Sequence, residues 1–342
     1  MKLFSIKTSA AYIPVVILLA LLQPRVTSAQ QDGSPSTNPE LGKISSAPSS
    51  VLSNSAENLD VLSLDASDLI AEKPLIGEKD ELPDFTRELI QLHWRFADPI
   101  DLYVIRPKGI EKPPVVLYLY SYPSEGDQFK DDGYCSRVTQ GGFAAVGFVS
   151  ALTGQRYHGR PMKQWFVSEL QEALVTSTHD VQMILDYLAT RGDLNMDRVG
   201  MMGAGSGATI AILSAAVEPR IKALDLLNPW GDWPDWIAYS ARVPDAERPN
   251  YIKPEFLKRA AVFDPVQWLP QLKSLPVRLE FLQDDVSNPL SCQKRIESAA
   301  PKNIEVVKYE NARALLDASA RGKHFQWIKD QLLRSTERAE AK

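Results

Sequence analysis

The chain has 342 residues, of which 44% are hydrophobic and 24% are charged, and its formal net charge at pH 7 is −5. This acidic balance, without a basic stripe, argues against a nucleic-acid partner. The two cysteines and four histidines show no metal-ligand spacing, so the sequence predicts neither a metal nor another cofactor.

The first 29 residues have the pattern of a signal peptide. Lys2 and Lys7 give the N-terminus positive charge, an apolar run extends from Ala10 to Leu22, and Thr27-Ser28-Ala29 offers small residues for cleavage by a signal peptidase. The apolar run is shorter than the roughly 20 residues that a membrane-spanning helix needs. We therefore expect an exported protein, periplasmic or secreted, with no stable membrane span after cleavage; an uncleaved anchor is the alternative.

Three further regions follow along the chain. Residues 30–83 are rich in Ser and Pro and predict a flexible leader, in which Val61-Leu62-Ser63-Leu64 and Leu69-Ile70-Ala71 are apolar enough to pack locally onto a domain. Residues 84–335 predict one large α/β domain. Residues 336–342 are expected to form a tail.

Strand and helix patterns alternate through the domain. Alternating residues at 89–94 and the run at 102–105 predict an antiparallel pair at a sheet edge. Buried strands are predicted at 115–120, 143–149, 199–202, 221–227, 277–282 and 304–307, and helices at 168–191 and 325–333, with another ending near residue 140. This order predicts a mostly parallel twisted sheet covered by helices on both faces.

Residues 229–272 break this alternation with clustered tryptophans, tyrosines and prolines. We interpret the segment as a cap-like insertion over the carboxyl ends of the strands, where open α/β sheets bind ligands. Trp230 and Trp233 are then candidates for substrate contacts. The alternative is that these aromatic side chains attach an irregular segment to the core.

The most informative stretch is Asp197-Arg198-Val199-Gly200-Met201-Met202-Gly203-Ala204-Gly205-Ser206-Gly207, a short apolar strand that enters a glycine-dense turn before a helix. It resembles the nucleophile elbow of the α/β-hydrolases, in particular their dienelactone-hydrolase and prolyl-oligopeptidase-like branch. In that family a sharp strand–turn–helix junction presents the nucleophile, and small residues two positions away let strand and helix approach. The resemblance extends over residues 84–335.

The elbow has two registers in this sequence. With Gly203 and Gly207 as the outer glycines, the nucleophile position holds Gly205, and the nucleophile is missing. With the other register, Ser206 is the nucleophile and is flanked by Ala204 and Ala208. The first register is favoured because it keeps residues 199–202 as the strand that leads directly into the turn.

The resemblance also implies an acid and a base in the family's chain order of nucleophile, acid, base. Asp285 follows the strand at 277–282 and precedes Pro289, as the family's acid does, and His324 follows the last predicted strand, where the family's base lies. The oxyanion donors are expected at Gly207 and, after the strand at 115–120, at Ser121 or Tyr122.

Three functions are compatible with this pattern. An ester or amide hydrolase would use Ser206 as nucleophile, His324 as base and Asp285 as the orienting acid, on a small-molecule or peptide substrate. A non-catalytic relative would bind a ligand or partner in the remnant cleft because Gly205 replaces the nucleophile. A slower alternative is hydrolysis by a water molecule that His324 and Asp285 activate.

Two further features of the sequence are open to interpretation. Gly203-x-Gly205-x-x-Ala208 with Asp225 downstream also fits a dinucleotide fingerprint, but Asp225 lies in the middle of a predicted strand rather than at its end. Cys135 and Cys292 either form a disulfide in an oxidising compartment or remain two buried thiols.

Overall fold

The computed structural model describes residues 62–96, 98–121, 126–151 and 170–340. Its strands are β1 (Leu75–Glu81), β2 (Phe85–Leu92), β3 (Ile100–Pro107), β4 (Pro114–Leu119), β5 (Ala144–Phe148), β6 (Asn195–Ala204), β7 (Ile221–Leu227), β8 (Val277–Leu282) and β9 (Glu305–Tyr309). Its α-helices are α2 (Asp132–Thr139), α3 (Leu170–Ala189), α4 (Ser206–Val217), α5 (Trp233–Tyr239), α6 (Arg248–Tyr251), α7 (Pro254–Ala260), α8 (Pro265–Trp268), α9 (Leu290–Ala299), α10 (Ala312–Ala320) and α11 (Lys323–Glu340). The predicted signal peptide and Tyr122 lie outside the described residues.

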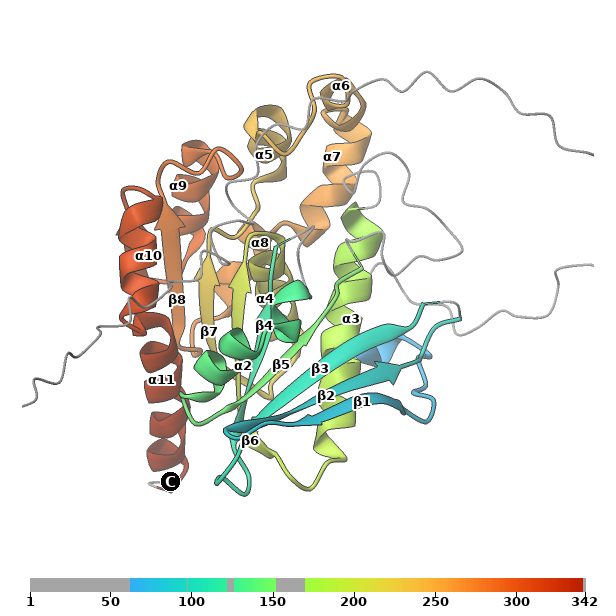
Figure 1. The fold of residues 1–342 in the computed structure, drawn as a ribbon. Helices are drawn as coiled ribbons and strands as arrows, with labels where there is room; N and C mark the ends of the chain where they lie inside the picture. Colours follow the sequence, from blue (N-terminus) through green and yellow to red (C-terminus); the bar gives the residue numbers. More distant parts are fainter. Residues whose placement is uncertain (1–61, 97, 122–125, 152–169, 341–342) are drawn as a thin grey trace, which may run out of the picture.

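The strands form one nine-stranded sheet in the order β1-β2-β3-β5-β4-β6-β7-β8-β9 (Figure 1). The pairs β1–β2, β2–β3 and β3–β5 are antiparallel, and the pairs from β5 through β9 are parallel. The predicted antiparallel edge and the mostly parallel sheet are both confirmed. Helices between the parallel strands provide the crossovers that such strands require.

Alternating side chains of the central strands divide the core into two layers. On β4, Leu117 packs in the cluster that contains residues of α3 and α4, whereas Tyr118 packs with residues of α2 and α11. On β6, Met201 and Met202 divide in the same way. The period of two along a strand therefore places α3 and α4 on one face of the sheet and α2 and α11 on the other (Figure 1).

The sheet begins earlier than the domain start expected at residue 84, and its last helix ends later than expected. β1 lies within the region predicted as a leader, where it pairs with β2 at the edge of the sheet. Most of its side chains are exposed, so it lacks the hydrophobic pattern that would have marked it as a strand. α11 continues to Glu340, through most of the predicted tail.

The segment before the sheet is attached to α3 through one glutamine. The Gln182 side chain accepts a hydrogen bond from the Leu64 backbone N–H at 3.0 Å and donates one to the Leu62 carbonyl at 2.9 Å. The Leu62 side chain is itself buried in the core. This confirms the expectation that Leu62 packs onto the domain.

The aromatic insertion consists of α5 to α8, and α5, α6 and α7 lie beyond the end of the sheet at which the parallel strands end (Figure 1). Three of the four tryptophans in residues 229–272 pack inward: Trp230, Trp233 and Trp236 are each at most 1% exposed. The carboxylate of Asp264 accepts hydrogen bonds from the backbone N–H groups of Asp232, Trp233 and Val266. These aromatic side chains therefore attach the segment to the core.

Two other expectations concern the cysteines and a membrane span. Cys135 and Cys292 are both buried free thiols, which decides between the two alternatives left open by the sequence. Within the residues that the structure describes, no helix is both long enough and apolar enough to cross a membrane.

Candidate functional site

The turn between β6 and α4 is centred on Gly205. β6 ends at Ala204, α4 begins at Ser206, and the single residue between them has φ 53° and ψ −119°. A positive φ of this kind is readily adopted only by glycine and is strained in other residues. The junction thus has the sharp strand–turn–helix geometry of an elbow, with glycine at its apex.

The glycines on either side of the apex allow this close approach. A Cβ atom on Gly203 would lie 2.6 Å from the Cα of Ala208 in α4, and one on Gly207 would lie 2.8 Å from the Tyr120 carbonyl oxygen. Both distances are too short for a side chain. These contacts correspond to the register in which Gly203 and Gly207 are the outer glycines.

The space where a side chain of residue 205 would project is filled by two neighbours. A Cβ atom there would collide with the Ser121 hydroxyl, and it would lie 2.9 Å from the Ser121 Cβ and 3.1 Å from the Trp230 Nε1. Ser121, predicted as an oxyanion residue, and Trp230, predicted to contact substrate, both lie against the apex of the elbow. Ser121 is 1% exposed.

Ser206 and His324 are on helices that cover opposite faces of the sheet. Ser206 is the first residue of α4 and is 2% exposed, while His324 is on α11, the helix that covers the opposite face of the sheet. Among the described residues, the ring of His324 has Glu280, Ser319 and Arg278 as its hydrogen-bond partners, and Ser206 is not one of them.

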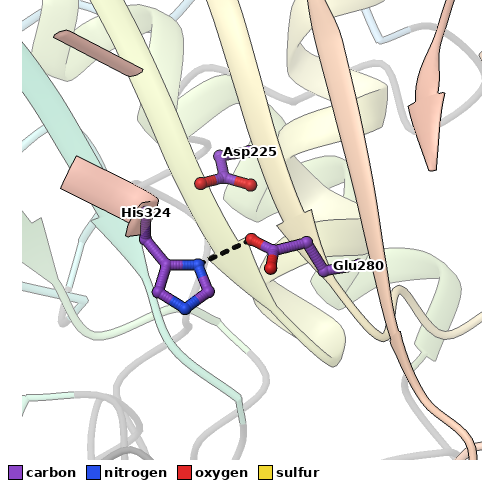
Figure 2. Close-up of side chains that lie close together, drawn as sticks. All are labelled: Asp225, Glu280 and His324. Atoms are coloured by element: carbon purple, nitrogen blue, oxygen red, sulfur yellow. Dashed lines mark hydrogen bonds and ion pairs between the residues drawn. The ribbon is translucent and has the colours of Figure 1, made fainter. Parts of the chain in front are cut away.

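His324 belongs to a buried cluster of charged side chains (Figure 2). Its Nδ1 lies 2.7 Å from Glu280 Oε1, and its Nε2 lies 3.0 Å from the Ser319 hydroxyl. Glu280 is on β8 and Asp225 on the neighbouring strand β7, and both carboxylates point toward the imidazole (Figure 2). The Tyr309 hydroxyl donates a hydrogen bond to the second oxygen of Glu280.

An arginine supplies the counter-charge in this cluster. The Arg278 guanidinium donates to both oxygens of Asp225, at 2.9 and 2.5 Å, and lies 3.2 Å from Glu280 Oε1. One ligand atom from each of Asp225, Glu280 and His324 lies within 4.8 Å of the others, a spacing that a metal ion could bridge. Because Arg278 already neutralises the carboxylates, these residues do not favour a divalent cation.

The pKa values of the cluster separate in opposite directions. Burial, and then the adjacent Glu280 carboxylate, raise the pKa of Asp225 to about 8, even though Arg278 binds it through two hydrogen bonds. Burial acts to raise the pKa of Glu280, but the hydrogen bond and charge of His324 outweigh it and lower that pKa to about 2. Burial acts to lower the pKa of His324, but its bond to Glu280 raises it overall. The pair therefore favours an imidazolium beside a carboxylate.

The acid beside His324 is Glu280 and not Asp285, which corrects the sequence-based assignment. Asp285 is 6% exposed and accepts a hydrogen bond from the Asn228 side chain at 2.8 Å and one from the Ser287 N–H at 2.8 Å. These bonds stabilise the loop after β8. Asp285 thus follows the strand as expected, but its carboxylate accepts hydrogen bonds from the Asn228 side chain and the Ser287 backbone and not from His324.

Asp225 does not suit the dinucleotide fingerprint either. A ribose-binding acid lies at the end of its strand, whereas Asp225 is in the middle of β7, 3% exposed, with both oxygens bound by Arg278. The glycines of the turn face α4 and β4, as described above. The structure therefore gives no support to a nucleotide site here.

A cavity of about 150 Å³ adjoins the charged cluster. It lies between the sheet and the helices α2, α10 and α11, and Asp225, Glu280 and His324 form one part of its lining. The residues that line it also include Gly203 and Ala204, at the end of β6 next to the elbow. A ligand in this cavity would therefore contact His324.

The sequence contained a signal for Glu280 that periodicity alone did not reveal. Arg278 and Glu280 alternate within a strand whose six residues are all buried. Two charged side chains on one face of such a strand must be paired, because burying an unpaired charge is costly. Asp225, in the middle of the neighbouring strand, is the partner that this rule requires.

Comparison with known proteins finds similarity to a peptidase family and to a hydrolase. Residues 98–261 match the family model of the X-Pro dipeptidyl-peptidases (S15 family). A curated protein of Bacillus subtilis (strain 168), "Putative hydrolase YtaP", is 27% identical over 139 residues, which are 35% of this chain and 45% of that protein. The match therefore spans less than half the length of this relative.

Solved structures of esterases share the fold. Acetyl xylan esterase from Paenibacillus sp. R4 superposes with a TM-score of 0.60 at 16% identity, covering 80% of this chain and 92% of that one. Acetyl xylan esterase 1 from Thermoanaerobacterium sp. JW/SL YS485 gives 0.56 at 16% identity, covering 75% and 88%. Identities this low establish the architecture and leave the activity to the residues of the site.

Proposed function

We propose that this chain, which has the α/β-hydrolase fold, forms no acyl-enzyme and instead binds a small molecule in the cavity beside His324. The observation that carries the proposal is Gly205 at the apex of the elbow. In hydrolases of this fold the apex residue supplies the attacking atom. Glycine has no such atom, and Ser121 and Trp230 occupy the space where a side chain would extend.

The position of Ser206 argues against Ser206 as the nucleophile. A general base must lie within hydrogen-bond reach of the hydroxyl that it deprotonates, or one water molecule away. The imidazole of His324 is bound by Glu280 on one nitrogen, and the hydroxyl within its reach on the other nitrogen is that of Ser319 and not of Ser206. The imidazole is covered by α10 and α11 on the opposite face of the sheet from α4.

The expected water-activated mechanism paired His324 with Asp285, and these two residues do not meet. The carboxylate beside His324 is that of Glu280, and its hydrogen bond raises the pKa of the imidazole. Asp285, the other expected member of this mechanism, is committed to Asn228 and Ser287.

The first test is labelling of the purified protein with a fluorophosphonate probe, beside Ser206→Ala and His324→Gln. A catalytically active serine esterase serves as the positive control, and circular dichroism establishes that each variant is folded. We expect no labelling of the wild type. Labelling that disappears in Ser206→Ala would overturn the proposal and assign Ser206 as the nucleophile. Labelling that persists in Ser206→Ala would also overturn it and assign another serine.

The second test asks whether the cavity admits a molecule. Xenon enters apolar cavities of about this size without specific chemistry, so its ¹²⁹Xe chemical shift reports on access. We expect the shift to depend on protein concentration in the wild type and to lose that dependence in Leu316→Trp, because Leu316 lines the cavity. Equal behaviour of the two proteins would contradict binding at this place.

We also propose that the protein is exported and that residues 1–29 are removed. The support is the sequence pattern of Lys2 and Lys7, the apolar run and Thr27-Ser28-Ala29. N-terminal sequencing of the protein expressed in a bacterial host should give Gln30 as the first residue of the exported form. An intact N-terminus would indicate the uncleaved anchor instead.

A further inference from the structure

The cavity beside His324 has the volume of a small aromatic molecule. Its volume is about 150 Å³, and an engineered protein cavity of about that volume binds benzene. Its wall is mainly aromatic and aliphatic, and includes Tyr120, Tyr134, Met202, Leu227, Leu316 and Phe325. A wall of this composition favours an apolar ring.

Most polar groups at the edge of the cavity already have partners. Asp225 is bound by Arg278, and Glu280 is bound by His324. The hydroxyls of Tyr120 and Tyr134 bind each other. A ligand therefore meets polar groups that are mostly paired here, and an anionic ligand would additionally lie next to the buried Glu280 carboxylate.

Two residues in this lining are exceptions: Arg137, whose guanidinium has no ion pair among the described residues, and Tyr118. The Tyr118 ring lies on β4, it is 3% exposed, and its hydroxyl has no hydrogen-bond partner among the described residues. Leaving such a group unpaired costs on the order of 1–3 kcal/mol. Burial, then Tyr120 and Asp225, raise the pKa of this phenol well above its usual range, so it keeps its proton and can donate it.

We propose that the cavity binds a neutral, single-ring aromatic molecule with one oxygen atom that accepts a hydrogen bond from the Tyr118 hydroxyl. This inference rests on the proposed function, because it names the class of ligand for the same cavity. The ring would pack between the tyrosines and Leu316. The ligand oxygen would face β4, at the end of the cavity nearest Asp225.

Calorimetric titrations with phenol, toluene and benzoate test the proposal on the wild type and on Tyr118→Phe. The variant removes only the hydroxyl, so the shape of the cavity is preserved. We expect phenol to bind the wild type more tightly than toluene or benzoate. Tyr118→Phe should weaken phenol binding about fivefold to tenfold, as expected for one hydrogen bond, and leave toluene binding unchanged.

The remaining outcomes are informative in different ways. If Tyr118→Phe leaves phenol affinity unchanged, water satisfies the hydroxyl and the acceptor part of the proposal is wrong. If benzoate binds most tightly, the neutral class is wrong. If xenon enters the cavity and no fluorophosphonate label appears, but phenol and toluene both fail to bind, the ligand class is overturned while the proposed function stands.

Discussion

Replacing Gly205 with alanine tests the central geometric claim, that this elbow cannot hold a side chain. Two costs add at this position. The backbone at φ 53° and ψ −119° costs a non-glycine residue about 1–3 kcal/mol. Placing a methyl group 2.9 Å from the Ser121 Cβ and 3.1 Å from the Trp230 Nε1 costs about 1–3 kcal/mol more through overpacking. The expected loss in the free energy of unfolding is about 2–6 kcal/mol.

The matched control is Gly109→Ala, because Gly109 also has a positive φ, of 82°, but a Cβ there meets nothing within 4 Å. This variant should lose only the backbone part, about 1–2 kcal/mol. A double-mutant cycle of Gly205→Ala with Ser121→Gly then isolates the collision, and we expect a favourable coupling energy of about 0.5–3 kcal/mol. Urea unfolding followed by circular dichroism measures all of these values.

Two results would refute the reasoning. If Gly205→Ala loses no more stability than Gly109→Ala, the space beside residue 205 is larger than the contacts with Ser121 and Trp230 indicate. If the coupling energy is zero, Ser121 is not the obstacle. In either case an engineered serine at position 205 becomes feasible, while the wild type still has no attacking atom at the apex of the elbow.

Three other predictions concern stability and reactivity. Glu280→Gln should lower the free energy of unfolding by about 3–5 kcal/mol, since it leaves buried positive charge without its partner. In the wild type, the stability that comes from the raised pKa of His324 is fully present below the unfolded pKa near 6.5 and is lost as pH rises through the folded pKa. This part of the decline should be absent in Glu280→Gln when the free energy of unfolding is measured across pH 5–9. Asp264→Ala removes an acceptor of three backbone hydrogen bonds and should cost about 2–4 kcal/mol by urea unfolding, a result contradicted by a change below 1 kcal/mol. Cys135 and Cys292, whose pKa values burial raises to about 11 and about 12, should react with a thiol reagent at pH 8 only after unfolding, and rapid labelling of the native protein would show that either is accessible.

Much of the fold was predictable because the buried strands of a parallel sheet have continuous apolar runs in the sequence. β4, β5, β7 and β8 lie within a residue or two of the segments expected from the sequence. β1 was missed because an exposed edge strand carries the charged residues that also mark a leader. Its position depends on pairing with β2, which no local pattern encodes.

The candidate site was less predictable than the fold. The small residues around Gly205 identified the turn, since close approach of strand and helix leaves a local signature in glycine. The partner of His324 could not be found the same way, because Glu280 and His324 are 44 residues apart and meet only when α11 packs on the sheet. The chain order of the catalytic residues in the family favoured Asp285, but its carboxylate accepts a hydrogen bond from the Ser287 N–H in its own loop.

The glutamine that fastens Leu62 and Leu64 to α3 has a mechanical consequence. A pull on the chain ahead of residue 62 reaches Gln182 and the buried Leu62 side chain before it reaches β1. Without that fastening, the same load would first act on the hydrogen bond from the Glu72 N–H to the His93 carbonyl and then on the pairing of β1 with β2, which begins at Leu75. Tension on the preceding segment therefore acts first on these contacts with α3 and only afterwards on the pairing of β1 with β2.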